Sequence, residues 1–282
     1  MFTGDGMFRQ TAVTALLAAF LGSAPAPALA LDSGWVETEG ARMRLVVDPE
    51  PDADGMTRGA LEIDLAEGWK TYWIDPGASG IPPQVDLSQS TGIELVALKL
   101  PAPIRVDDGY SIWAGYKHPV SLALEMRREG AAELKANVFL GLCEKICVPF
   151  QADFSVTLPA PGEVHGTDVR AKVAVAKAFS DLPAQPSHDF DVLSAWADEG
   201  GESISVGLII PAGVEAEPAL FVHGPDGWLF GTPELVAEAD GEVRFSLPVE
   251  GRPKATQEQV PLDVVVTLGD RAIETTIPLE QN

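Results

Sequence analysis

Cys143 and Cys147 are the only two cysteines in a chain of 282 residues, and three residues separate them. Thiol–disulfide exchange needs a sulfur that an incoming thiolate can reach, so a pair that closes a short surface loop suits this chemistry. The alternative is a structural disulfide, which is common in exported proteins. The chain-entropy relation assigns a loop of about five residues roughly 2 kcal/mol of stabilisation, against about 4 kcal/mol for a loop near sixty residues. The short loop therefore favours a reactive pair without excluding a structural one.

Two charged residues, Glu144 and Lys145, lie between the cysteines. A nearby cation stabilises a thiolate and lowers its pKa, whereas a carboxylate opposes it. Both residues are therefore candidates for tuning the thiolates, with opposite signs. The alternative is that they are ordinary solvated residues of a turn.

A reduced cysteine pair can also bind Cu(I), because soft thiolate ligands select this ion. A copper(I)-binding or copper-tolerance module is therefore one alternative function. The sequence predicts no other metal ligands, since the four histidines are scattered and no pair has the short spacing of a metal site. It also contains no glycine-rich phosphate loop before a helix and no Gly-x-Ser-x-Gly motif, so we predict no organic cofactor.

The elements around the cysteines are predicted to be β-strands. Apolar and polar residues alternate in segments 41–47, 60–65, 120–126 and 152–158. Period-two alternation buries one face of a strand and leaves the other in water, which is typical of antiparallel sheets. An apolar run at 136–142 leads into the cysteine pair, which we place at the tip or shoulder of a β-hairpin.

The pattern changes between residues 159 and 187, which we interpret as a connector holding one helix. Thr167 is suited to cap a helix that begins near Asp168, and Leu182 and Pro183 end it. Strand patterns then resume, and Gly269 and Asp270 predict a tight hairpin. The clearest of these later strand segments are 203–208, 219–222, 243–247, 262–268 and 272–277. We therefore predict an all-β protein with one β-sandwich domain at 31–158 and a second at 188–282.

Residues 1–30 have the features of a cleavable signal peptide. Arg9 precedes an apolar run at 11–22, and Ala28-Leu29-Ala30 fits the small-x-small cleavage rule. The run is too short to span a bilayer, and no later segment approaches 18 uninterrupted apolar residues. We therefore expect a mature chain from Leu31 to Asn282, without a transmembrane segment, exported to a bacterial periplasm.

The formal net charge of −23 excludes proteins held to nucleic acid by a basic surface. Its distribution is uneven. Residues 188–282 hold 18 acidic and 4 basic side chains, whereas residues 101–150, around the cysteines, hold six of each. The acidity therefore belongs mainly to the second predicted domain.

Three separated blocks resemble one family in the same order. They are residues 71–83, Gly115-Tyr116-Lys117, and residues 143–149. The chain resembles the N-terminal periplasmic domain of DsbD-type protein-disulfide reductases. The likeness is closer to the ScsB branch, in which three residues also lie between the cysteines. It covers residues 35–158 strongly and the second predicted domain more weakly.

The resemblance implies immunoglobulin-like sandwiches and a thiol–disulfide oxidoreductase, the electron-transfer domain of a protein-disulfide reductase. It implies that Cys147 forms mixed disulfides and that Cys143 resolves them. Electrons would come from a membrane-embedded donor and pass to periplasmic thioredoxin-fold proteins. The family's reductases continue into membrane and thioredoxin domains, and we expect neither in this chain. Either a separate membrane protein supplies the electrons, or the domain has another use.

The family domain also carries a loop that caps the cysteines, and Asp107, Asp108 and Tyr110 lie where this loop is expected. Tyr110 is the candidate shield, the alternative being an exposed turn. Trp69, Tyr72 and Trp73 either flank the site or belong to the sandwich core. The remaining alternative function is a non-catalytic interaction domain whose disulfide is structural.

Overall fold

The computed structural model describes residue 1 and residues 31–163, 169–239, 241–254 and 259–280. The expected signal peptide at residues 2–30 and the expected helix cap at Thr167 and Asp168 lie outside the described residues. In the described part of the chain, no helix has the length and apolarity needed to cross a membrane.

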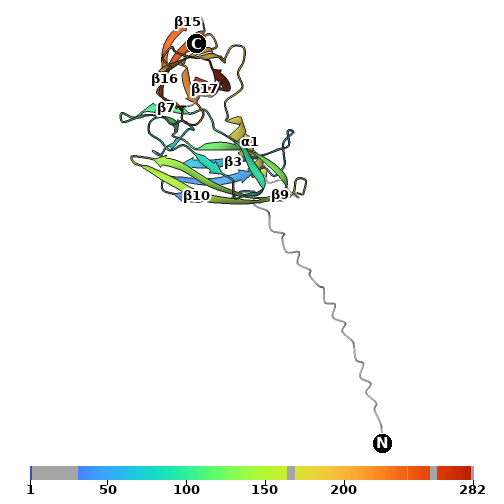
Figure 1. Cartoon of the computed structure of the whole chain (residues 1–282). Helices are drawn as coiled ribbons and strands as arrows, with labels where there is room; N and C mark the ends of the chain where they lie inside the picture. The colour runs from blue at the N-terminus through green and yellow to red at the C-terminus, as the bar shows by residue number, and fades with distance from the viewer. Residues whose placement is uncertain (2–30, 164–168, 240, 255–258, 281–282) are drawn as a thin grey trace.

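The predicted all-β class is confirmed, and the described strands fall into two sandwich-like domains stacked one above the other in Figure 1. The first domain contains β1 (Val36–Thr38), β2 (Ala41–Val47), β3 (Met56–Leu65), β4 (Thr71–Tyr72), β5 (Gln84–Asp86), β6 (Thr91–Lys99), β7 (Ile104–Asp107), β8 (Ile112–Tyr116), β9 (Val120–Cys143) and β10 (Cys147–Leu158). Its larger sheet has the order β1-β2-β3-β9-β10, with β5 and β6 also paired to β9, and its smaller sheet has the order β4-β8-β7. All these pairs are antiparallel.

β9 is longer than the sequence pattern indicates, because the segments 120–126 and 136–142 belong to one strand. Its first half pairs with β3, and its second half pairs along its whole length with β10. Gly130 lies between the two halves with φ of 77°, a conformation that glycine adopts without steric cost. The strand therefore carries the chain from the centre of the sheet to the cysteine hairpin without interruption.

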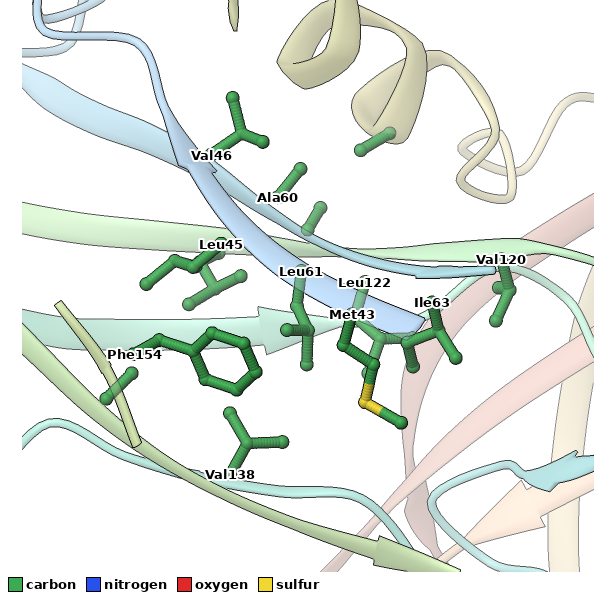
Figure 2. Packing of buried hydrophobic residues seen from close by; sticks show 14 of the residues in the cluster. Met43, Leu45, Val46, Ala60, Leu61, Ile63, Val120, Leu122, Val138 and Phe154 are labelled. Atoms are coloured by element: carbon green, nitrogen blue, oxygen red, sulfur yellow. The ribbon is translucent and has the colours of Figure 1, made fainter. Parts of the chain in front are cut away.

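The core of the first domain follows from the alternation along β2 and β3. Figure 2 shows Leu45 and Leu61 pointing toward Phe154 and Val138, while Val46 and Ala60 point to the opposite face. The helix α1 (Val169–Ser180) covers that second face with its buried residues Ala171, Val175 and Ala178. The predicted helix is thus confirmed, and it completes the first domain.

The second domain has two sheets. One contains β11 (Asp191–Ala197), β12 (Ser203–Ile209), β16 (Glu242–Gly251), β14 (Leu229–Phe230) and β15 (Glu234–Ala239), and the other contains β13 (Ala219–His223), β17 (Val260–Leu268) and β18 (Arg271–Leu279). The predicted hairpin at Gly269 and Asp270 is confirmed, since Leu268 pairs with Arg271. Buried side chains from both sheets form a separate core.

The two domains share a packed interface. Phe221 and Val265 of the second domain are buried within the core of the first. Phe221 contacts Trp73 edge to face, with ring centroids 5.9 Å apart, and Arg105 donates a 2.8 Å hydrogen bond to the carbonyl of Leu220. The second domain is therefore packed directly behind β4 and β7, two strands that lead to the cysteine site.

Candidate functional site

The β9–β10 hairpin places the two cysteines opposite each other. Cys143 is the last residue of β9, Cys147 is the first residue of β10, and the strand register pairs them directly. Their Cα atoms are 4.1 Å apart and their sulfurs form a disulfide. The cysteines thus close the end of the hairpin, where the sequence pattern predicted them.

The two cysteine residues differ in exposure to solvent. The Cys143 residue is buried, with 1% of its surface exposed, whereas Cys147 is exposed. The backbone of Cys143 is further fixed by reciprocal hydrogen bonds with Lys70, of 2.8 and 3.0 Å. An incoming thiolate must approach a sulfur in line with the S–S bond. Cys147 is therefore the more exposed of the two residues, and its role as the sulfur that partners attack stays a prediction.

The hydroxyl of Tyr72 contacts both sulfurs. Its oxygen is 2.9 Å from Sγ of Cys143 and 3.0 Å from Sγ of Cys147. The sulfurs of a disulfide carry no hydrogen, so the tyrosine O–H is the donor in this state. Burial raises the pKa of Tyr72, and the nearby charge of Asp108 acts in the same direction. The hydroxyl therefore stays protonated and can donate a hydrogen bond to a thiolate formed at either position.

Three glycines make room for Tyr72. A Cβ added at Gly80 would lie 2.8 Å from the Tyr72 ring, one at Gly141 would lie 3.0 Å from it, and one at Gly115 would lie 2.8 Å from the Tyr72 Cα. The last two glycines lie on strands that flank β4, so the backbones approach closely. We call Gly80, Gly115 and Gly141 the glycine cradle. It holds the hydroxyl against the disulfide.

A charged and aromatic cluster lies beside the tyrosine. Trp113 packs edge to face on Tyr72, with ring centroids 6.0 Å apart. Its indole N–H donates to Asp108, and the Lys70 ammonium forms a 2.9 Å ion pair with the same carboxylate. The hydrogen bond from Lys70 and those from the backbone of Ser111 and Tyr110 hold the pKa of Asp108 well below its usual range. Asp108 is therefore ionised and ties its loop to the site.

The expected cap loop is thus placed next to the site, but its tip points away. Tyr110 is fully exposed, so it does not cover the sulfurs in this structure. Asp107 is also exposed and accepts a hydrogen bond from the backbone of Gly109 within the loop. A shielding role for Tyr110 remains a prediction that requires the loop to move.

The other predicted residues are distributed as follows. Glu144 and Lys145 are exposed in the turn between the cysteines. Trp73 is buried in the first-domain core and contacts Phe221, while the Trp69 ring covers Gly40 and packs on the same core. Among the three aromatic residues of this segment, Tyr72 is the one that contacts the sulfurs.

Sequence reasoning missed Lys70 and Trp113. Lys70 lies two residues before Tyr72 and pairs with Cys143, whereas Trp113 lies on β8. The Gly115-Tyr116-Lys117 block, also on or next to β8, contributes to the sequence prediction only through its likeness to the family. A glycine next to alternating aromatic residues indicates a close backbone approach, and this signal could have directed attention to β8.

The described residues contain no cluster of three or more histidine, cysteine or acidic side chains able to hold a metal ion. The sulfurs are bonded to each other, so the chemistry available in this state is exchange at the disulfide. An all-β domain with one accessible and one buried sulfur at a hairpin end has the architecture of a thiol–disulfide exchange domain.

Comparison with known families agrees with that class. Residues 43–159 match the family described as "Thiol:disulfide interchange protein DsbD, N-terminal", so this part of the chain is similar to that family. Residues 181–282 match a family described only as a domain of unknown function, DUF8393. No curated protein matches the chain.

Among solved structures, the chain is similar to the N-terminal periplasmic domain of ScsB from Proteus mirabilis. The TM-score is 0.69 at 20% sequence identity, over 89% of this chain and 99% of that one. This likeness extends the shared fold to both domains. The viral chemokine-binding protein R17 of rodent gammaherpesvirus Peru also aligns, at 10% identity over 87% of this chain and 86% of that one. Its TM-score of 0.24 is too low to carry any inference.

Proposed function

We propose that this protein is a periplasmic thiol–disulfide interchange protein that carries electrons between a membrane-embedded donor and periplasmic thioredoxin-fold proteins. The observation that carries the proposal is the unequal placement of the two sulfurs. Cys147 is exposed at the hairpin end, while Cys143 is buried against the Tyr72 hydroxyl. The periplasmic location is supported by the signal-like N-terminus and by the printed description of the ScsB domain.

Reduction of the protein proceeds in two exchanges. A donor thiolate attacks Sγ of Cys147, the Cys143–Cys147 bond breaks, and Cys143 leaves as a thiolate that accepts the Tyr72 hydrogen bond and then takes a proton. The donor's second thiolate attacks the sulfur of the mixed disulfide that belongs to the donor, which releases Cys147 as a thiolate that takes a second proton and oxidises the donor to a disulfide. Two electrons and two protons have then reached the cysteine pair.

Transfer to an acceptor reverses these steps. The Cys147 thiolate attacks the acceptor's disulfide and forms a mixed disulfide, and one acceptor sulfur leaves as a thiolate. The Cys143 thiolate then attacks Cys147, restores the intramolecular bond and releases the reduced acceptor. The hydrogen bond from Tyr72 lowers the cost of each step in which Cys143 carries negative charge.

A redox titration tests the proposal. The chain without residues 1–30 is equilibrated in glutathione and dithiothreitol buffers, and the fraction of free thiol is read by alkylation and mass spectrometry. We expect a potential above about −300 mV, the upper end of the range of inert structural disulfides. A potential well below this value would favour a structural disulfide in a non-catalytic interaction domain.

The copper alternative is tested with the reduced form of the same protein. Competition with a Cu(I) chelator measures affinity, and Cys143→Ser combined with Cys147→Ser is the control. Sub-micromolar binding that this double variant loses would support a copper module, because the two thiolates are its only soft thiolate ligands.

A further inference from the structure

A cleft lies between the two domains, next to the redox site. Its volume is about 400 Å³, and both domains contribute to its walls. The first domain supplies Asp75, Ile112 and Trp113, and the second supplies Phe230, Pro233 and Glu250. The cleft is therefore a surface that neither domain forms alone.

The cleft and the disulfide share a wall. Trp113 lines the cleft and packs on Tyr72, and the Tyr72 hydroxyl contacts both sulfurs. Two aromatic side chains thus separate the sulfurs from the cleft. Figure 1 shows β7, the strand that leads into the loop at the cleft, directly beneath the second domain. The cleft is therefore joined to the disulfide through two side chains that contact each other.

Exposed apolar side chains lie on both the cysteine hairpin and the neighbouring loop. Ile146 is 77% exposed and Val148 is 47% exposed on the hairpin, and Tyr110 and Ile112 are exposed on the neighbouring loop. The Lys70–Asp108 ion pair holds this loop beside Cys143, so the two groups border the same site. We call Tyr110, Ile112, Ile146 and Val148 the apolar collar. Apolar side chains gathered around a reactive sulfur are typical of a protein-binding surface rather than of a solvated turn.

The charges in the cleft favour a basic partner. Burial raises the pKa of Asp75, the backbone hydrogen bond from Gly77 and the charges of His223 and Arg105 act against this, and Glu250 adds a smaller upward effect. Arg105 is already engaged, since it donates to the Leu220 carbonyl and lies over the Phe221 ring. Glu250 is exposed, and it belongs to a domain with 18 acidic and 4 basic residues. Arg105 already acts on Asp75, so a cation that enters the cleft meets the exposed carboxylate of Glu250.

We propose that the interdomain cleft and the apolar collar form one docking surface for the partner's reactive cysteine and the segment that carries it. The surface selects a segment with apolar residues for the collar and a lysine or arginine for Glu250. This inference rests on the proposed thiol–disulfide exchange at Cys147, and it gives the second domain a role in partner selection.

The test uses two short peptides that share one cysteine and flanking leucines, of which one carries lysines and the other glutamates. Each peptide thiolate attacks the oxidised protein, bonds to Cys147 and displaces Cys143 as a thiolate, which takes a proton. Acid quenching and mass spectrometry give the rate of mixed-disulfide formation. The measured quantity is the ratio of the lysine-peptide rate to the glutamate-peptide rate, which cancels general changes in sulfur reactivity.

We expect this ratio to be about tenfold at low salt for the unmodified chain. Glu250→Lys should lower the ratio by about threefold or more, and Glu250→Gln should lower it by less. Glu238→Lys is the matched control, because Glu238 is exposed on β15, lies outside the cleft and gives the same change in net charge. Ile112→Ser should slow both peptides alike.

A ratio near one, or an equal fall with Glu250→Lys and Glu238→Lys, would overturn the docking surface. Exchange of the unmodified chain with dithiothreitol separates this failure from that of the proposed function. If dithiothreitol reduces the disulfide while the ratio of the two peptide rates is near one, only the proposed docking surface is wrong. If dithiothreitol does not reduce it, the proposed exchange and the docking surface fail together.

Discussion

The hydroxyl oxygen of Tyr72 lies 2.9 Å from Sγ of Cys143, inside the first domain and away from solvent. A thiolate at this buried position loses its hydration, which raises its energy unless a donor replaces the lost water. The tyrosine is that donor, and it stays protonated because burial raises its pKa. The contact couples the chemistry of the Cys143 sulfur to a side chain 71 residues away.

Tyr72→Phe should slow reduction of the protein by dithiothreitol by about tenfold or more, since a hydrogen bond to a charged group is worth about 1.5–3 kcal/mol. The same loss should raise the pKa of the Cys143 thiol, which alkylation rates across pH will show. Tyr116→Phe is the matched control, because Tyr116 is buried and its hydroxyl bonds the Pro101 carbonyl instead of a sulfur. Equal rates for the two variants would contradict the role of Tyr72.

Gly141→Ala should reproduce much of this loss without touching the hydroxyl. The added methyl would lie 2.9 Å from Cβ of Ile81 and 3.0 Å from the Tyr72 ring, so the ring must shift away from the sulfurs. We expect slower exchange together with a lower free energy of unfolding, by about 1–3 kcal/mol. Gly200→Ala is the control, since its nearest contact would be at 3.6 Å on the surface of the second domain. Unchanged exchange in Gly141→Ala would show that the cradle does not position Tyr72.

The Lys70–Asp108 ion pair predicts a specific pH dependence. The pKa of Asp108 is depressed in the folded state, so its contribution to stability is fully present above the unfolded carboxyl pKa, near 4, and is lost as pH falls through the lower folded pKa. The difference in melting temperature between the unmodified chain and Asp108→Asn should therefore be constant from pH 5 to 8. It should shrink below about pH 4. A difference that changes near neutral pH would point to another group.

The interface predicts that the domains unfold together. Phe221 belongs to the second domain but is buried in the core of the first. Phe221→Ala should lower the free energy of unfolding by about 3–5 kcal/mol and should shift signals from both domains alike. Phe245→Ala, in the core of the second domain alone, is the comparison. Two separate transitions in the unmodified chain would contradict a shared core.

The strands were largely predictable because their chemistry is local. Alternation along β2 matches its observed bounds, and the two cysteines were correctly placed at a hairpin end. β9 was harder to predict, because its continuation past Gly130 depends on its pairing with β3 before Gly130 and with β10 after it.

The site was only partly predictable. Tyr72 ends the short β4 and Trp73 follows it, but the local pattern does not say that one contacts the disulfide and the other contacts Phe221. Those contacts join residues far apart in the chain, so they depend on the packed fold. The side of the loop on which Tyr110 lies is likewise set by the bonds of Asp108 to Lys70 and Trp113.

Mixed-disulfide trapping with single-cysteine variants tests the central claim most directly. Cys143→Ser and Cys147→Ser are each expressed with the export signal, thiols are quenched with acid and alkylating agent, and mixed disulfides are separated without reductant and identified by mass spectrometry. The account predicts that Cys143→Ser accumulates mixed disulfides through Cys147, while Cys147→Ser, with its remaining sulfur buried, accumulates few. Equal trapping by the two variants, or more trapping by Cys147→Ser, would contradict the assignment of Cys147 as the sulfur that partners attack.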